Sequence, residues 1–109
     1  MPSQVATPVF RVDKFAVPAA ALSAFLARVK WVDRVLAEMP GCRQNLVLTQ
    51  AGEASSEFNV TTIVEWESAE AMSAAKARVR WRYAEEGFDP AAFMRRVGVR
   101  ADLGEYGPA

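Results

Sequence analysis

The sequence predicts an α+β domain of the ferredoxin-like type, in which a four-stranded antiparallel sheet carries both long helices on one face. Two long helical patterns and four short runs typical of strands follow one another in the order β-α-β-β-α-β within 109 residues. A chain of this length is one domain. We therefore expect residues 1–109 to form a single domain with an ordered core at about 8–104.

The first strand and helix are predicted between residues 9 and 39. Residues 9–17 (VFRVDKFAV) are rich in Val and Phe, which favours a strand. Pro18 suits the first turn of a helix, where a backbone N–H is not needed. The apolar stripe of this helix recurs at three- and four-residue spacing and consists of Leu22, Phe25, Val29, Val32, Leu36 and Met39. The charged residues placed off this stripe are Lys30, Asp33, Arg34 and Glu38. Pro40-Gly41 ends the helix.

The second half of the chain predicts a hairpin, two helices and a last strand. Residues 42–50 and 58–66 are strand-like, and the polar loop 51–57 joins them as an antiparallel pair. Ser68 is a suitable N-cap for a long helix that Gly87 ends. The inner stripe of that helix is Met72, Ala75, Val79 and Tyr83. Asp89-Pro90 starts a short helix, PAAFMRRV, closed by Gly98, and residues 99–103 are the last strand before a tail rich in Gly and Pro.

Both faces of the predicted sheet carry apolar residues. Leu46 and Leu48 lie on one side of the second strand, and Val47 lies on the other. An antiparallel sheet with a solvated face would alternate apolar and polar residues. Because the helices cover one face only, we expect a second copy of the chain to pack on the other face and form a homodimer.

Composition excludes several classes of function. Thirteen basic and thirteen acidic residues cancel, which argues against nucleic acid and an anionic membrane surface as partners. The chain contains no histidine, so Ser-His-Asp and Cys-His catalysis are excluded and a metal site is not expected. The N-terminus lacks a signal-peptide pattern, no apolar run is long enough to span a bilayer, and one cysteine cannot form an internal disulfide. These features predict a cytoplasmic protein.

Cys42, the single cysteine, is expected to be structural. A reactive thiol needs neighbouring positive charge and exposure. Arg43 follows it in sequence but points to the opposite side of a strand. Cysteine is also among the most frequently buried residue types.

Two segments give the chain a family resemblance. The helix-ending MPGC at 39–42 and the segment FNVTTIVEWES at 58–68 resemble the antibiotic biosynthesis monooxygenase domain over about residues 8–104. The resemblance implies a dimeric α/β barrel. The family includes cofactor-free oxygenases of quinols and anthrones, haem-degrading enzymes, and domains without known activity. Positions that carry an acidic residue, a histidine or an asparagine in many members hold Val64, Ala75 and Phe10 here, which disfavours haem oxygenation.

The same resemblance suggests a site between the sheet and the helices. Trp66 occupies a position that commonly lines the pocket, either as a core aromatic or as a wall for a planar ring. We expect Asn45 to orient the substrate and an arginine of the second long helix, Arg80, to stabilise an anion. The expected substrate-binding residues are Trp66, Val64, Thr62, Met72, Val79, Tyr83 and Phe25. Asn59 falls on the opposite side of its strand from Trp66, and its amide is either structural or ligand-directed.

Two functions remain open from the sequence. The first is a monooxygenase of small aromatic or quinol-type substrates that needs no cofactor. Its base would be water, a carboxylate with a raised pKa, or the substrate's own acidity. The alternative is a non-catalytic domain of the same fold, either an accessory domain or one that binds a small hydrophobic or aromatic ligand. A nucleic-acid-binding role for KARVRWRY (76–83) is disfavoured, because these side chains point to different sides of a helix. An RNA-binding module of the ferredoxin-like type is also disfavoured, because few basic residues flank Phe10, Phe15 and Phe58.

Overall fold

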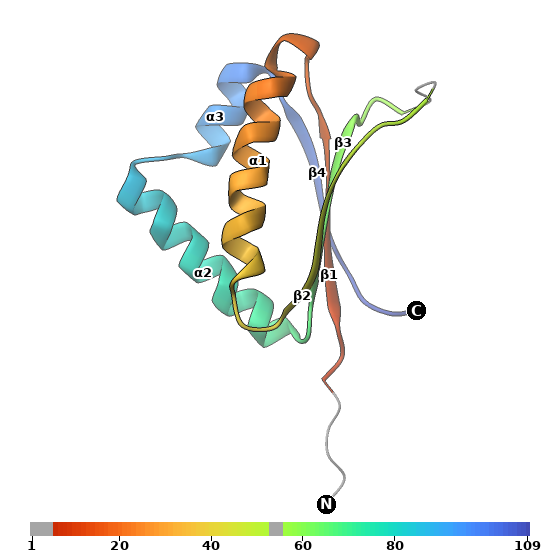
Figure 1. Cartoon of the computed structure of the whole chain (residues 1–109), viewed down its shortest axis with the longest axis vertical. Helices are drawn as coiled ribbons and strands as arrows, with labels where there is room; N and C mark the ends of the chain where they lie inside the picture. Colours follow the sequence, from red (N-terminus) through yellow and green to blue (C-terminus); the bar gives the residue numbers. More distant parts are fainter. Residues whose placement is uncertain (1–5, 53–55) are drawn as a thin grey trace, which may run out of the picture.

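The computed structural model describes residues 6–52 and 56–109, and these form one antiparallel sheet with helices on one of its faces (Figure 1). The strands are β1 (Val9–Ala16), β2 (Cys42–Thr49), β3 (Val60–Trp66) and β4 (Arg100–Tyr106). The helices are α1 (Leu22–Ala37), α2 (Ala69–Glu86) and α3 (Pro90–Val97), preceded by the short 3-10 helix η1 (Ala19–Ala21). The predicted α+β fold is confirmed. No helix in the described ranges is long and apolar enough to cross a membrane.

The strand order is β2-β3-β1-β4, with every neighbouring pair antiparallel. Strand alternation gives the sheet two different faces. The helix-facing side carries Arg11, Asp13 and Phe15 of β1 opposite Val64, Thr62 and Val60 of β3. We call the other side the open face; its apolar residues are Phe10, Val12, Leu46, Leu48, Ile63 and Tyr106.

The predicted helix caps are present. The Ser68 hydroxyl accepts a hydrogen bond from the Ala71 N–H at 3.1 Å, and the Asp89 carboxylate accepts one from the Ala92 N–H at 3.1 Å. Both bonds satisfy first-turn donors that have no partner within their own helix. Helices α2 and α3 each end at the glycine expected from the sequence.

Several predicted boundaries shift. Pro18 precedes the 3-10 turn η1 instead of opening the α-helix directly, and α1 ends at Ala37, before Met39. Strand β4 continues past residue 103 to Tyr106, because Phe10 pairs with Tyr106 and extends the ladder. Strand β3 begins at Val60 rather than residue 58. Part of the predicted loop 51–57, residues 53–55, lies outside the described residues.

The turn at Gly41 brings the start of β2 against α2. Gly41 has φ +86°, a conformation that residues with a side chain rarely adopt. A Cβ atom there would lie 2.6 Å from the Ala71 Cβ. The Gly41 carbonyl also accepts a hydrogen bond from the Glu67 N–H at 2.8 Å. Glycine is therefore required both by the backbone conformation and by the close approach of the helix.

The buried core consists of two clusters under the helices. The first core cluster is Phe15, Val17, Phe25, Val60 and Val99, against which residues of α1 and α3 pack. The second core cluster is Val64, Trp66, Met72 and Ala75. The helix-facing side of the sheet therefore contributes to both clusters, with β1 and β3 as their common floor.

Candidate functional site

A cavity of about 390 Å³ lies between the helix-facing side of the sheet and the helices, and residues of both core clusters line it. Its volume lies within the range of small-molecule sites. The sequence-predicted residues that line it are Phe25, Thr62, Val64, Trp66, Met72, Val79, Arg80 and Tyr83. The structure therefore brings together every predicted site residue except Asn45.

Asn45 does not line the cavity. Its side-chain amide donates a hydrogen bond to the main-chain oxygen of Asp33 at 2.7 Å. This bond joins β2 to α1 and uses the amide that the sequence analysis expected to orient a substrate. Asn59 has a comparable role, because its side chain bonds both the N–H (2.8 Å) and the carbonyl (2.9 Å) of Val17. Both amides are structural in this fold.

Trp66 is both a core residue and a cavity wall. Its side chain is 3% exposed and packs in the second core cluster with Val64, Met72 and Ala75. It also lines the cavity, where an indole offers a planar surface for an aromatic ligand. The two interpretations that the sequence left open therefore hold together.

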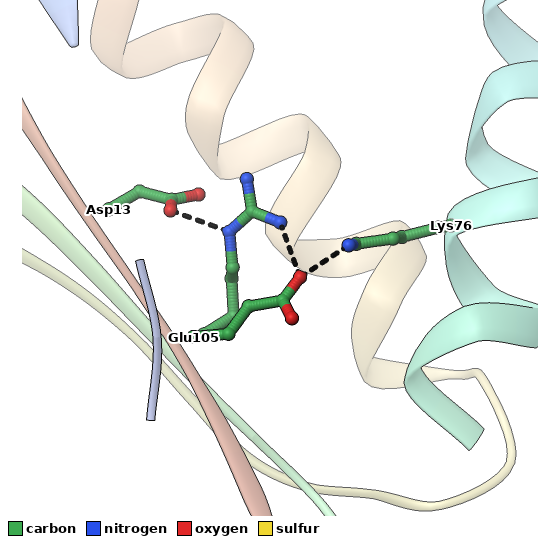
Figure 2. A network of polar contacts seen from close by, with 4 residues as sticks. Asp13, Lys76 and Glu105 are labelled. Atoms are coloured by element: carbon green, nitrogen blue, oxygen red, sulfur yellow. Dashed lines mark hydrogen bonds and ion pairs between the residues drawn. The ribbon is translucent and has the colours of Figure 1, made fainter. Parts of the chain in front are cut away.

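A network of ion pairs beside the cavity joins β1, β4 and α2 (Figure 2). The Arg11 Nε lies 2.6 Å from Asp13 Oδ1, and the Arg11 Nη1 lies 3.5 Å from Glu105 Oε1. The Lys76 Nζ donates to the same Glu105 oxygen at 2.5 Å. Arg11, Asp13 and Lys76 line the cavity. We call Arg11, Asp13, Lys76 and Glu105 the charged network; each of its charges faces an opposite charge.

A different arrangement occupies the region between α1 and α2. The Arg28 guanidinium carbon lies 3.6 Å from the centre of the Phe88 ring, 4.4 Å from that of Trp31 and 5.5 Å from that of Tyr83. The Trp31 and Tyr83 rings are stacked with their centres 6.4 Å apart. We call Arg28 and these three rings the Arg28 cluster. Arg28, Tyr83 and Phe88 line the cavity, and burial raises the pKa of the Tyr83 hydroxyl.

Asp33 adds a carboxylate to the cavity wall. Asp33 lines the cavity together with Val32 and Leu36. Its predicted position off the apolar stripe of α1 is therefore wrong. Burial raises the pKa of the Asp33 carboxyl, and the positive charge of Arg34 partly opposes that effect. A carboxylate that is hard to ionise accepts a proton more readily than an ordinary aspartate.

Cys42 is half-buried and packs against the second core cluster. Burial raises the pKa of its thiol, and the nearby charge of Asp33 raises it further. A raised pKa leaves little thiolate at neutral pH, which agrees with a structural role.

The charged residues of the cavity wall other than Arg80 were not predicted from the sequence; they are Arg11, Asp13, Arg28, Asp33 and Lys76. A signal was available for some of them. Arg28 follows Phe25 by three residues and Asp33 follows Val29 by four, so both lie along the apolar stripe of α1. Arg11 and Asp13 lie on the side of β1 that also carries buried Phe15, whereas Phe10 and Val12 lie on the other side. Charges at such positions point to a polar site within a core.

Two features remain to be placed: Trp81 of the segment 76–83, and any group of side chains that could bind a metal ion. Trp81 is 64% exposed and does not line the cavity. Within the ranges 6–52 and 56–109, no group of three or more Cys, Asp or Glu side chains is placed to hold a metal ion.

The family can be assigned by comparison with known sequences. The sequence model of the antibiotic biosynthesis monooxygenase family matches residues 8–87, which is most of the chain. The protein belongs to this family. The match includes Pro40-Gly41-Cys42 and Trp66, the residues on which the resemblance was based. No curated protein sequence matches the chain significantly.

Solved structures of other family-like proteins share the fold. A Shewanella loihica PV-4 protein provisionally named a monooxygenase is 18% identical, with a TM-score of 0.74 over 97% of this chain and 98% of its own. A mutant of SnoaB, a cofactor-independent oxygenase of Streptomyces nogalater, is 20% identical, with a TM-score of 0.65 over 93% and 92%. A haem-degrading protein of Mycobacterium tuberculosis is 22% identical, with a TM-score of 0.57 over 94% and 91%. At these identities the likeness establishes the fold alone.

Proposed function

We propose that the protein is a cofactor-independent monooxygenase that oxidises small aromatic substrates of the quinol or anthrone type in the cytoplasm. The observation that carries the proposal is the cavity of about 390 Å³ with Trp66 in its wall and carboxylates and cations among its apolar residues. Family membership and the fold shared with SnoaB support the same reaction class. Haem chemistry has less support, because the chain lacks histidine, a common ligand of haem iron.

The proposed reaction needs no external reductant. An anthrone-type CH₂ group would lose two hydrogen atoms and gain one oxygen atom from O₂, and the second oxygen atom would leave as water. The substrate first loses a proton, and the resulting anion passes an electron to O₂. The protein's part is to bind and orient the ring, exclude water, accept the first proton and stabilise the anion.

Asp33 is the proposed base. It lines the cavity, and its raised pKa brings it closer to the range in which a general base works at neutral pH. Trp66 is the proposed platform for the ring. Arg80 of α2, which is exposed and also lines the cavity, would contribute its positive charge to stabilising the anion. The base that the sequence could not identify is thus assigned to a carboxylate in the wall.

Turnover is tested by incubating the purified protein with a panel of hydroquinones and anthrones under O₂. Substrate loss and O₂ uptake are measured together, and we expect equal molar amounts for an anthrone. Asp33→Asn should lower kcat by about 10²-fold or more while leaving substrate binding in place. The matched control is Glu85→Gln, which removes an exposed carboxylate of α2 that does not line the cavity. No substrate loss across the panel would contradict the proposal.

The pH dependence gives a second test of the base. Asp33 must be ionised to accept a proton, so activity is lost as the pH falls through its pKa. Because burial raises this pKa above the ordinary 3.8, the acidic limb of kcat/KM should lie at higher pH than for an ordinary aspartate. A profile unchanged in Asp33→Asn would assign the limb to another group.

The second candidate function is ligand binding without turnover. Its support is the replacement of familiar polar positions of the family by Val64 and Ala75, both of which are buried in the second core cluster. A ligand that binds beside Trp66 but is not consumed under O₂ would favour this alternative.

We further propose that the protein is a homodimer joined through the open face. Leu46, Leu48 and Tyr106 are 36%, 44% and 55% exposed on this face. Large exposed apolar residues on one sheet face favour packing against a second sheet. Sedimentation should give a dimer at micromolar concentration, and Leu48→Lys should shift it towards the monomer. A wild-type monomer would contradict this assembly.

A further inference from the structure

Arg28 is held in an unusual way for a charged residue beside a cavity. Its guanidinium lies over the Phe88 and Trp31 rings, at 3.6 Å and 4.4 Å from their centres. Stacking on aromatic faces stabilises the cation and fixes its plane. A guanidinium that stacks by its face keeps its N–H groups, which lie in its plane, available as donors.

The N–H groups of Arg28 are poorly satisfied within the described part of the chain. The nearest acidic partner, Glu86, is 45% exposed, and its carboxylate oxygen lies 3.5 Å from Nη2, at the limit of a hydrogen bond. The Nε atom is enclosed and has no hydrogen-bond acceptor among the residues that the structure describes. Because Nε is enclosed, a ligand in the cavity would meet the terminal Nη groups of Arg28.

Several of the other charged residues of the cavity wall are already paired within the protein. Asp13 is paired with Arg11 at 2.6 Å, and Lys76 is bonded to Glu105. Asp33 and the exposed Arg80 also line the cavity, and neither forms an ion pair among the residues that the structure describes. Arg28 therefore provides positive charge to the cavity that only a long and exposed ion pair opposes.

We propose that Arg28 recognises a negative group of the ligand, so that the cavity selects planar aromatic anions, carboxylates or phenolates, over neutral aromatics of the same shape. This inference rests on the proposed function of the cavity and names the substrate class that it would take. The guanidinium offers parallel N–H donors that match a carboxylate, and hydrogen bonds between charged groups are about twice as strong as neutral ones. The Tyr83 and Phe88 rings, which line the cavity, provide the adjacent apolar surface.

The test compares two probes of nearly identical shape, naphthalene-2-carboxylate and naphthalene-2-carboxamide, by isothermal titration calorimetry. The wild type should bind the carboxylate about tenfold more tightly than the amide. Arg28→Gln should remove this preference and change the affinity for the amide by no more than about twofold. Arg78→Gln, which removes an exposed arginine of α2 that does not line the cavity, should keep the preference and controls for net charge.

Glu86→Gln gives an independent test that does not depend on the folding of an Arg28 variant. Removing the competing carboxylate should tighten binding of naphthalene-2-carboxylate about two- to fivefold and leave the amide unchanged. The inference is overturned if wild type binds neither probe at millimolar concentration, if it binds both equally, or if Arg28→Gln weakens both equally. Binding is measured without O₂, so a protein that prefers the carboxylate but consumes no substrate would refute the oxygenase proposal alone.

Discussion

Arg11 and Arg28 line the same cavity and are equally exposed, at 24% of each side chain, yet they are held in opposite ways. Arg11 lies 2.6 Å from Asp13 and also contacts Glu105, so its charge is neutralised by carboxylates. Arg28 is stacked on rings and has one ion pair at 3.5 Å. Burial alone therefore does not distinguish a structural cation from a ligand-binding one. The distinguishing feature is whether the protein satisfies its N–H donors.

The difference follows from the elements that carry the two residues. On β1, residues two apart share a face, so the alternation places Arg11 and Asp13 side by side. On α1, residues three apart are neighbours, which places Trp31 beside Arg28. The strand thus supplies its arginine with a carboxylate, and the helix supplies its arginine with a ring. We expect variants of the charged network to affect stability and variants of the Arg28 cluster to affect binding.

Trp66→Ala should have the largest effect on stability, because Trp66 is buried in the second core cluster and also lines the cavity. Replacing a buried aromatic by Ala typically costs about 3–5 kcal/mol of the free energy of unfolding. Trp66 is 3% exposed, so we expect a loss in this range in chemical denaturation. Trp81→Ala is the matched control, because Trp81 is 64% exposed and should change the stability by less than about 0.5 kcal/mol. Equal effects of the two variants would contradict the role of Trp66 in the core.

Asp13→Ala should have the next largest effect and separates the two arginines directly. It leaves the Arg11 Nε without its 2.6 Å partner, and we expect a loss of about 1–3 kcal/mol in the free energy of unfolding. Arg28→Gln removes no short hydrogen bond and should cost less than Asp13→Ala in the same measurement.

The control for this prediction is Glu57→Gln, which breaks a pair of similar length in solvent. Glu57 lies 2.7 Å from Arg100, and the two side chains are 55% and 67% exposed. Exposed pairs contribute little to stability because water and salt screen them, so the loss should be clearly smaller than for Asp13→Ala. A larger loss in Arg28→Gln than in Asp13→Ala would reverse the contrast that we draw between the two residues.

The fold could be predicted from the sequence because its signals are local. The cap at Ser68, the turn at Gly41 and the β-branched residues of 58–66 each depend on near neighbours in the chain. Each predicted its element, with bounds that shift by a few residues. The extension of β4 to Tyr106 could not be predicted, because it depends on pairing with Phe10, which lies at the other end of the sequence. Pairing between distant strands overrode the local signal of the Gly/Pro-rich tail.

The candidate site could be predicted mainly for its apolar half, together with Thr62 and Arg80. Residues such as Val64 and Met72 line the cavity because they face the core, and the hydrophobic pattern shows which residues face the core. Asn45 was assigned to the cavity on residue type, whereas its amide bonds the Asp33 carbonyl on a neighbouring element. The engagement of a polar group depends on partners that are distant in sequence, so Arg28 and Arg11 could not be distinguished before the structure was known.

The smallest predicted effect concerns the charged network at acidic pH. The hydrogen bond from Lys76 holds the pKa of the Glu105 carboxyl below its usual 4.5, with a further contribution from the Arg11 charge. Because the folded-state pKa is lower than the unfolded one, the pair stabilises the fold above the unfolded pKa, and this contribution is lost as the pH falls through the folded pKa. The difference in free energy of unfolding between wild type and Glu105→Gln should therefore be present at neutral pH and vanish at acidic pH.

The size of this difference should be small, because both side chains are more than 40% exposed, at 42% for Lys76 and 46% for Glu105. It should also shrink at about 1 M salt, where exposed charges are screened over a few ångströms. Denaturation curves at neutral and acidic pH, with and without salt, provide the measurement. A difference that persists at acidic pH and at high salt would show that Glu105 stabilises β4 by packing and not by its charge.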